Sequence, residues 1–167
     1  MLIIAAAKTL PERLFGIDII KVNLQEGMSM DINKNLYQAE TTKSTAQFTV
    51  DFTTVCQKYD FVVNNSDSMD MKKTFTLHGG VVADDFDLYM MQICKPTKAD
   101  KSLSFNPERA ILMPKFVMVF SYNGKTQIRF MSYGMADIAA MVPGDSSFPD
   151  SLVESFTKIR SMIDEAR

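Results

Sequence analysis

Apolar residues recur at helical spacing in the stretch that follows Ser44. This apolar stripe consists of Phe48, Phe52, Val55, Cys56 and Tyr59. Its spacing of three and four residues is that of one face of an α-helix. Ser44-x-x-Gln47 has the pattern of a capping box, in which two side chains satisfy backbone N–H groups at a helix start. We therefore predict a helix over residues 45–58 with its stripe against the core.

Short apolar runs bounded by turn residues predict strands, expected over residues 36–42, 61–63, 86–94, 116–122 and 126–133. The last two runs flank Asn123-Gly124. This dipeptide tolerates the positive φ angles of a tight hairpin turn. The two strands should therefore pair in antiparallel fashion.

The same pattern predicts three further helices. Ser68 is expected to cap a short helix that carries Met71, Phe75 and His78 on one face and ends at Gly79-Gly80. A second helix covers residues 135–142, and a C-terminal helix begins near Pro149. The buried stripe of that last helix comprises Leu152, Phe156, Ile159 and Ile163. The order of elements favours an α+β fold, with an antiparallel sheet of about four to five strands, helices packed on it and a C-terminal helix.

The chain divides into an N-terminal extension, residues 1–32, and a single α+β domain, residues 33–167. Within the extension, the pattern allows a short helix broken near Pro11 and a strand over residues 17–24. The apolar first residues lack the positive n-region of a signal peptide. We expect a cytoplasmic protein for the chain as written, and a periplasmic one if the true start lies upstream.

Composition excludes several classes of function. The chain has 46% hydrophobic and 23% charged residues and a formal net charge of −2. No basic cluster reaches the density of a nucleic-acid footprint, so nucleic acid is not an expected partner. No apolar run has the length of a membrane span. The two cysteines match no zinc or disulfide framework, and no nucleotide or cofactor motif is present.

Five features together resemble the bacterial and archaeal family called domain of unknown function 302. They are the 45–58 helix leading into Tyr59-Asp60-Phe61-Val62-Val63, the strand end Ile93-Cys94-Lys95-Pro96, the helix with Ala99 and Leu103, the Leu112-Met113-Pro114-Lys115 entry into a hairpin, and the C-terminal helix. The resemblance covers roughly residues 34–167 and implies a small α+β domain that pairs as a homodimer. It implies no particular reaction.

The chain departs from this family's pattern at two positions. Lys95 stands where the family commonly has asparagine, and Lys115 stands where a second cysteine is common. A redox or metal pair of two cysteines would therefore be broken here, and Cys94 alone carries over. We predict neither a catalytic nor a metal-ligating residue set.

Two proline-marked strand junctions are the predicted ligand-binding site. Its residues are Cys94, Lys95, Pro96, Pro114 and Lys115. The resemblance places these junctions together, and nearby lysines favour a thiolate. The first hypothesis is a non-catalytic dimeric domain that binds a small molecule or a protein partner near the end of the 86–94 strand.

Two alternatives stay open. A thiol-dependent enzyme or sulfur-transfer protein would use Cys94. A copper-handling protein would use soft thioether and thiolate ligands, for which the thirteen methionines, including Met28-x-Met30 and Met69-x-Met71, supply the donors. Methionines that fill gaps in the core explain most of the same pattern. Cys56 lies on the apolar stripe and is expected to be structural.

Overall fold

The computed structural model describes residues 32–167. The helices are α1 (Ile32–Asn35), α2 (Thr45–Lys58), α3 (Met71–Leu77), α4 (Pro96–Phe105), α5 (Met135–Met141) and α6 (Phe148–Ala166), with a 3-10 helix, η1 (Pro107–Leu112). The strands are β1 (Leu36–Thr41), β2 (Val62–Val63), β3 (Leu88–Cys94), β4 (Lys115–Tyr122) and β5 (Lys125–Met131). The expected strand and helix over residues 1–31 lie outside the described residues.

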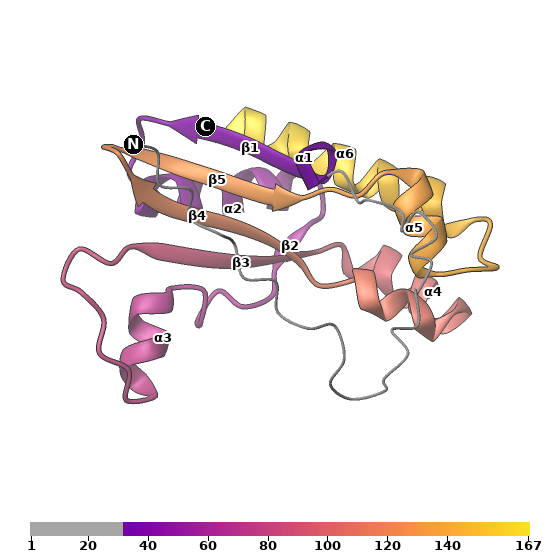
Figure 1. Cartoon of the computed structure of the whole chain (residues 1–167), viewed down its shortest axis with the longest axis horizontal. Helices are drawn as coiled ribbons and strands as arrows, with labels where there is room; N and C mark the ends of the chain where they lie inside the picture. The colour runs from indigo at the N-terminus through magenta and orange to yellow at the C-terminus, as the bar shows by residue number, and fades with distance from the viewer. Residues whose placement is uncertain (1–31) are drawn as a thin grey trace, which may run out of the picture.

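The strands form one five-stranded antiparallel sheet in the order β1-β5-β4-β3-β2 (Figure 1). The β4–β5 hairpin turns at Asn123 and Gly124, whose φ angles are 52° and 73°. Both values fit the tight turn predicted from this dipeptide. The predicted fold class, α+β with an antiparallel sheet and a C-terminal helix, is confirmed.

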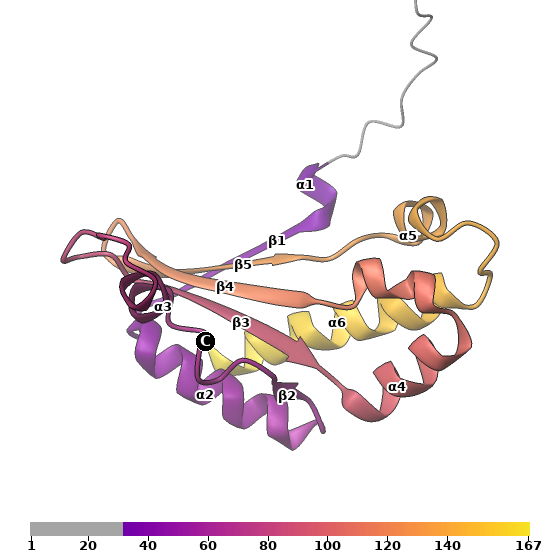
Figure 2. The same ribbon diagram turned by 90° about the horizontal axis from the view of Figure 1, so that it is seen from below.

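One face of the sheet is covered by α2 and α6, which contact each other (Figure 2). The predicted stripe of α6 is buried throughout, and Phe48, Phe52 and Cys56 of α2 are fully buried. From the sheet, Met91, Ile93, Val117, Val119, Ile128 and Phe130 complete this core. Burial of apolar surface is the main stabilising term of a domain, so this layer holds the fold together.

The start of α2 satisfies only half of the predicted capping box. The Ser44 hydroxyl accepts a hydrogen bond from the backbone N–H of Gln47 at 3.1 Å. The Gln47 side chain instead donates to Asp51, one turn further along the helix. A carboxylate at i+4 is a strong acceptor and draws the amide away from the helix start.

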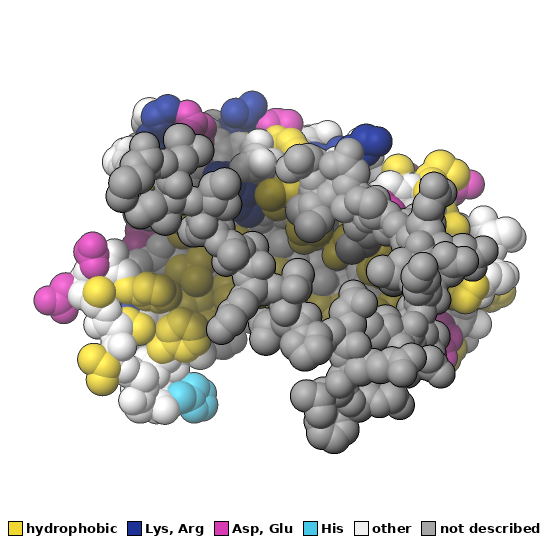
Figure 3. Space-filling view, viewed as in Figure 1, with side chains coloured by type: hydrophobic (Ala, Val, Ile, Leu, Met, Phe, Trp, Pro, Cys, Tyr) yellow, Lys and Arg dark blue, Asp and Glu magenta, His cyan; other side chains and the backbone are white. Residues whose placement is uncertain are grey.

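The short helix α3 differs from its prediction. Its N-cap is Asp70, which accepts from the backbone N–H of Lys73, and not Ser68. None of its residues is buried. His78, expected on an apolar face, is exposed, and the single histidine side chain lies at the surface (cyan in Figure 3). The residues predicted on the apolar face of this helix do not join the main core. α3 instead lies beside β3, and the ring of Phe75 contacts the ring of Phe86.

Candidate functional site

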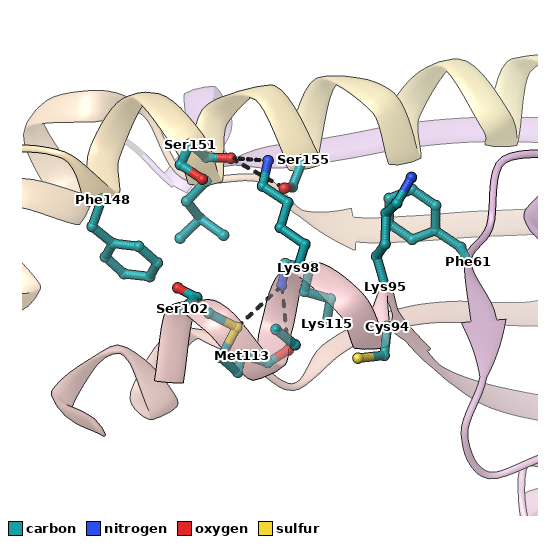
Figure 4. A pocket seen from close by; sticks show the side chains of 12 residues that line it. Phe61, Cys94, Lys95, Lys98, Ser102, Met113, Lys115, Phe148, Ser151 and Ser155 are labelled. Carbon is teal, nitrogen blue, oxygen red and sulfur yellow. Dashed lines mark hydrogen bonds between the residues drawn. The ribbon is translucent and has the colours of Figure 1, made fainter. Parts of the chain in front are cut away.

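A small cavity of about 30 Å³ lies between α4 and α6, where β3 ends and β4 begins (Figure 4). Its walls combine polar and apolar side chains: Phe61, Cys94, Lys95, Lys98, Ala99, Ser102, Met113, Lys115, Phe148, Ser151, Leu152 and Ser155. A space of this size holds one or a few water-sized groups. The cavity therefore suits a small molecule or the end of a larger one.

The cavity exists because α4 covers the end of the sheet without filling the space beneath it. β3 stops at Cys94, Lys95 has extended backbone as the N-cap, and Pro96 opens α4. Proline suits a first helical turn because its φ is fixed and it has no N–H to satisfy. None of the residues of α4 is buried, in contrast to α6. A cavity therefore remains between the inner face of α4 and α6.

A buried ion pair contacts the wall of the cavity at Ser102. The Arg109 guanidinium donates two hydrogen bonds to Asp145, at 2.6 Å and 2.7 Å, and one to the hydroxyl of Ser102 at 3.1 Å. The two charged side chains are only 8% and 4% exposed. The Arg109 guanidinium, with further hydrogen bonds from Asn106 and Ser147, holds the pKa of the Asp145 carboxyl well below its usual range. This bidentate pair connects η1 to the loop before α6.

Lys115 places an amine against this cavity. It is the first residue of β4 and pairs with Ile93 in the sheet. Its Nζ lies 3.4 Å from the carbonyl oxygen of Met113 and 3.8 Å from the Met113 sulfur. Among residues 32–167, no carboxylate forms an ion pair with it.

Burial lowers the pKa of the Lys115 amine, because desolvation disfavours the ammonium form. The charge of Lys98 also lowers this pKa, and a Cys94 thiolate would raise it. Lys115 is half-buried, and its amine has a carbonyl and a thioether as partners in place of a carboxylate among residues 32–167.

Two further lysines stand at the mouth of the cavity. Lys98 donates to the carbonyl of Ser151 at 3.0 Å and pairs with Glu154 at 2.8 Å. Lys95 lies 3.5 Å from the carboxylate of Asp60, and its ammonium lies 5.5 Å from the centre of the Phe61 ring. The two carboxylates are 78% and 85% exposed. Exposed ion pairs contribute little to stability, so either carboxylate can give way to a bound anion.

The mouth opens into a groove of about 530 Å³ that shares Phe61, Lys95, Lys98 and Ser155 with the cavity. Lys58 and Lys158 also line this groove, together with Tyr59. The Lys158 ammonium lies 3.3 Å from the centre of the Tyr59 ring. Lysines outnumber carboxylates along the groove and cavity together. Their combined surface therefore favours a ligand with negative charge.

The two cysteines have different environments. Cys56 is fully buried in the layer between α2 and the sheet, and burial raises the pKa of its thiol to about 12. This burial supports the prediction that Cys56 has a structural role. Cys94 is half-buried and lines the cavity.

The structure brings together three of the five predicted site residues, namely Cys94, Lys95 and Lys115. Pro96 opens α4 and sets its direction. Pro114 lines a separate pocket of about 400 Å³ that Lys115 also borders. Their role in binding stays a prediction.

Sequence reasoning missed Lys98 and the Arg109–Asp145 pair. The helix that begins at Pro96 could have pointed to Lys98 as a site residue, because position 98 falls within the first turn of that helix. Nothing in the sequence joins Arg109 to a residue 36 positions away.

No group of three or more histidine, cysteine, aspartate or glutamate side chains within residues 32–167 is arranged to hold a metal ion. Met91 is fully buried in the core, and Met90 pairs with Met118 on the opposite face of the sheet. Met28-x-Met30 lies outside the described residues. Within the described part of the chain, no helix is both long enough and apolar enough to span a membrane.

Comparison with known proteins identifies the family of this chain. A chain described as "uncharacterized conserved protein DUF302 from Bacillus stearothermophilus" has a similar crystal structure, with a TM-score of 0.65 and 14% sequence identity over 79% of this chain and 98% of that one. At this identity the likeness concerns the fold. No curated protein matches the chain. The sequence model of the family described as "Domain of unknown function DUF302" matches residues 37–166. The chain therefore belongs to the DUF302 family.

Proposed function

We propose that the domain binds a small anionic molecule, without catalysis, in the cavity between α4 and α6. The observation that carries this proposal is the Lys115 amine, which faces the cavity and, among residues 32–167, has a carbonyl and a thioether but no carboxylate as partners. A hydrogen bond to a charged group contributes about 1.5–3 kcal/mol. A ligand that accepts a hydrogen bond from this amine gains that contribution.

The charges at the mouth support an anion. Lys95 and Lys98 come from the end of β3 and the start of α4, and both line the cavity as well as the groove outside it. Their present partners, Asp60 and Glu154, are exposed and weakly held. A ligand carboxylate or phosphate can take the place of these exposed carboxylates and form charge-assisted hydrogen bonds with both lysines.

Calorimetry with a set of small carboxylates and phosphates tests this proposal. Lys115→Met and Lys98→Met should each weaken the tightest binder, by about tenfold to a hundredfold, because hydrogen bonds to charged groups contribute about 1.5–3 kcal/mol. Lys101→Met is the matched control, since Lys101 lies on α4 but is exposed and does not line the cavity. Equal affinities for all three variants would place the binding site elsewhere.

The homodimer that the family resemblance implies is part of the same proposal. Native mass spectrometry of protein purified without tags, chelators or reductant reads both features at once. A dimer that carries one extra mass per chain supports ligand binding and pairing together. A monomer at micromolar concentration would remove the dimer and leave the cavity to be judged by calorimetry.

A further inference from the structure

We propose that Lys115 captures a small aldehyde that carries a carboxylate, by forming an imine with its carbonyl carbon. This inference rests on the proposed function, because it assigns a chemical class to the ligand of the same cavity. The anionic end of the ligand lies at the mouth with Lys95 and Lys98. Its aldehyde end lies inside, beside the amine of Lys115.

The dimensions of the cavity support an aldehyde in particular. The inner space of about 30 Å³ accepts a group the size of one or two heavy atoms, whereas the connected groove of about 530 Å³ accepts the rest of a larger molecule. A terminal aldehyde is the smallest carbonyl group, with one hydrogen on its carbon. A carbonyl flanked by two larger groups does not fit the inner space as well.

The surroundings of Lys115 favour a nucleophilic amine. Imine formation needs the unprotonated amine, and enzymes obtain it by desolvating a lysine or by placing a second cation near it. Both features are present, since Lys115 is largely removed from solvent and the charge of Lys98 opposes its protonation. Phe148 and Leu152 supply apolar wall to the same cavity and are 2% exposed each.

Cys94 is the titratable group that acts in the opposite sense. A thiolate at this position would favour the ammonium form of Lys115.

The reaction balances without an oxidant or reductant. The nitrogen lone pair of Lys115 forms a bond to the carbonyl carbon, and the proton lost from nitrogen is taken up by the carbonyl oxygen. The resulting carbinolamine then loses that oxygen as water, with a second proton from nitrogen. One imine and one water are the products, and the step reverses when water returns.

Reductive trapping with glyoxylate tests the proposal on the full chain. The protein is incubated at neutral pH with glyoxylate and cyanoborohydride, which reduces the imine to a stable carboxymethyl amine, and labelled peptides are mapped by mass spectrometry. We expect Lys115 to be labelled at least about ten times faster than exposed Lys101, because only its amine is desolvated. Acetaldehyde, which lacks the carboxylate, should label Lys115 more slowly than glyoxylate does.

Matched variants separate this proposal from the one on which it rests. Lys115→Met should abolish the selective adduct, and Lys101→Met should leave it unchanged. Labelling of Lys115 no faster than that of Lys101 in the wild type overturns the imine, and this result does not depend on any variant folding. If carboxylates still bind by calorimetry in that case, the anion-binding proposal stands alone. Selective labelling that acetaldehyde and glyoxylate give equally would retain the imine and overturn the carboxylate at the mouth.

Discussion

Cys56 on α2 and Cys94 at the end of β3 lie in two regions of the molecule that have opposite character. Around Cys56, the long helices α2 and α6 press apolar stripes against the strands and leave the thiol fully buried. Around Cys94, the shorter α4 covers the strand ends without burying any of its own residues, and lysines line the space beneath it. The continuous apolar stripes of α2 and α6 exclude solvent from the sheet, whereas the partly exposed α4 leaves a cavity between itself and the strand ends.

Truncating one large apolar side chain in each region measures this difference. Phe52→Ala removes a fully buried ring of α2 that stacks on Phe48, with ring centres 5.6 Å apart. The loss should be about 3–5 kcal/mol in the free energy of unfolding, as for other buried phenylalanines. Met113→Ala, at the cavity wall, is half-buried and should cost less than half as much. Urea denaturation gives both values, and equal losses would mean that the cavity region is packed as tightly as the core.

Alkylation separates the two thiols by rate. Since the pKa of the Cys56 thiol is about 12, its thiolate fraction at pH 8 is only about one in ten thousand, and no solvent reaches it. Iodoacetamide should therefore label Cys94 at least about a hundred times faster than Cys56 in the folded protein. Peptide mapping by mass spectrometry reads the ratio. Cys94→Ser is the control, because it leaves Cys56 alone and should show labelling only after denaturation.

The sealed region was predictable because its signal is local. Helical spacing in the segments that became α2 and α6, together with Asn123-Gly124, determines which residues face the sheet and where the hairpin turns. The helix start at Asp70 was missed because Ser68 is also a good cap two residues away, and local pattern does not choose between them. Competing local signals thus shift boundaries but preserve the fold.

The cavity region was predictable only in part. Cys94, Lys95 and Lys115 were found because they lie at two proline-marked strand junctions that the family resemblance places together. The pair Arg109–Asp145 was not found, since it depends on how η1 and the loop before α6 approach each other in the folded chain. Contacts between residues that are distant in the sequence, such as this ion pair, leave no signal in the spacing of apolar residues along the chain.

The stability change expected on substitution of Lys115 is the smallest of these predicted effects, and its sign is informative. Burial lowers the pKa of this amine below the ordinary value of 10.5, so between the two values the unfolded chain binds more protons than the folded protein does. The stability of the wild type therefore rises with pH in the window below 10.5, relative to Lys115→Met, which has no proton to bind. At neutral pH the variant should melt about 2 °C higher than the wild type, because folding of the variant no longer has to desolvate or deprotonate the lysine ammonium.

Thermal melts of both proteins from pH 7 to pH 10.5 measure this trend, with Lys101→Met as the exposed control that should follow the wild type. A variant that melts lower at neutral pH would show that the Lys115 ammonium is stabilised by negative charge in the cavity. The cavity would then be an anion site with a charged inner end, and the nucleophilic amine would have to be abandoned while anion binding gained support. The sign of this stability change therefore distinguishes a nucleophilic Lys115 amine from a charged Lys115 that binds an anion.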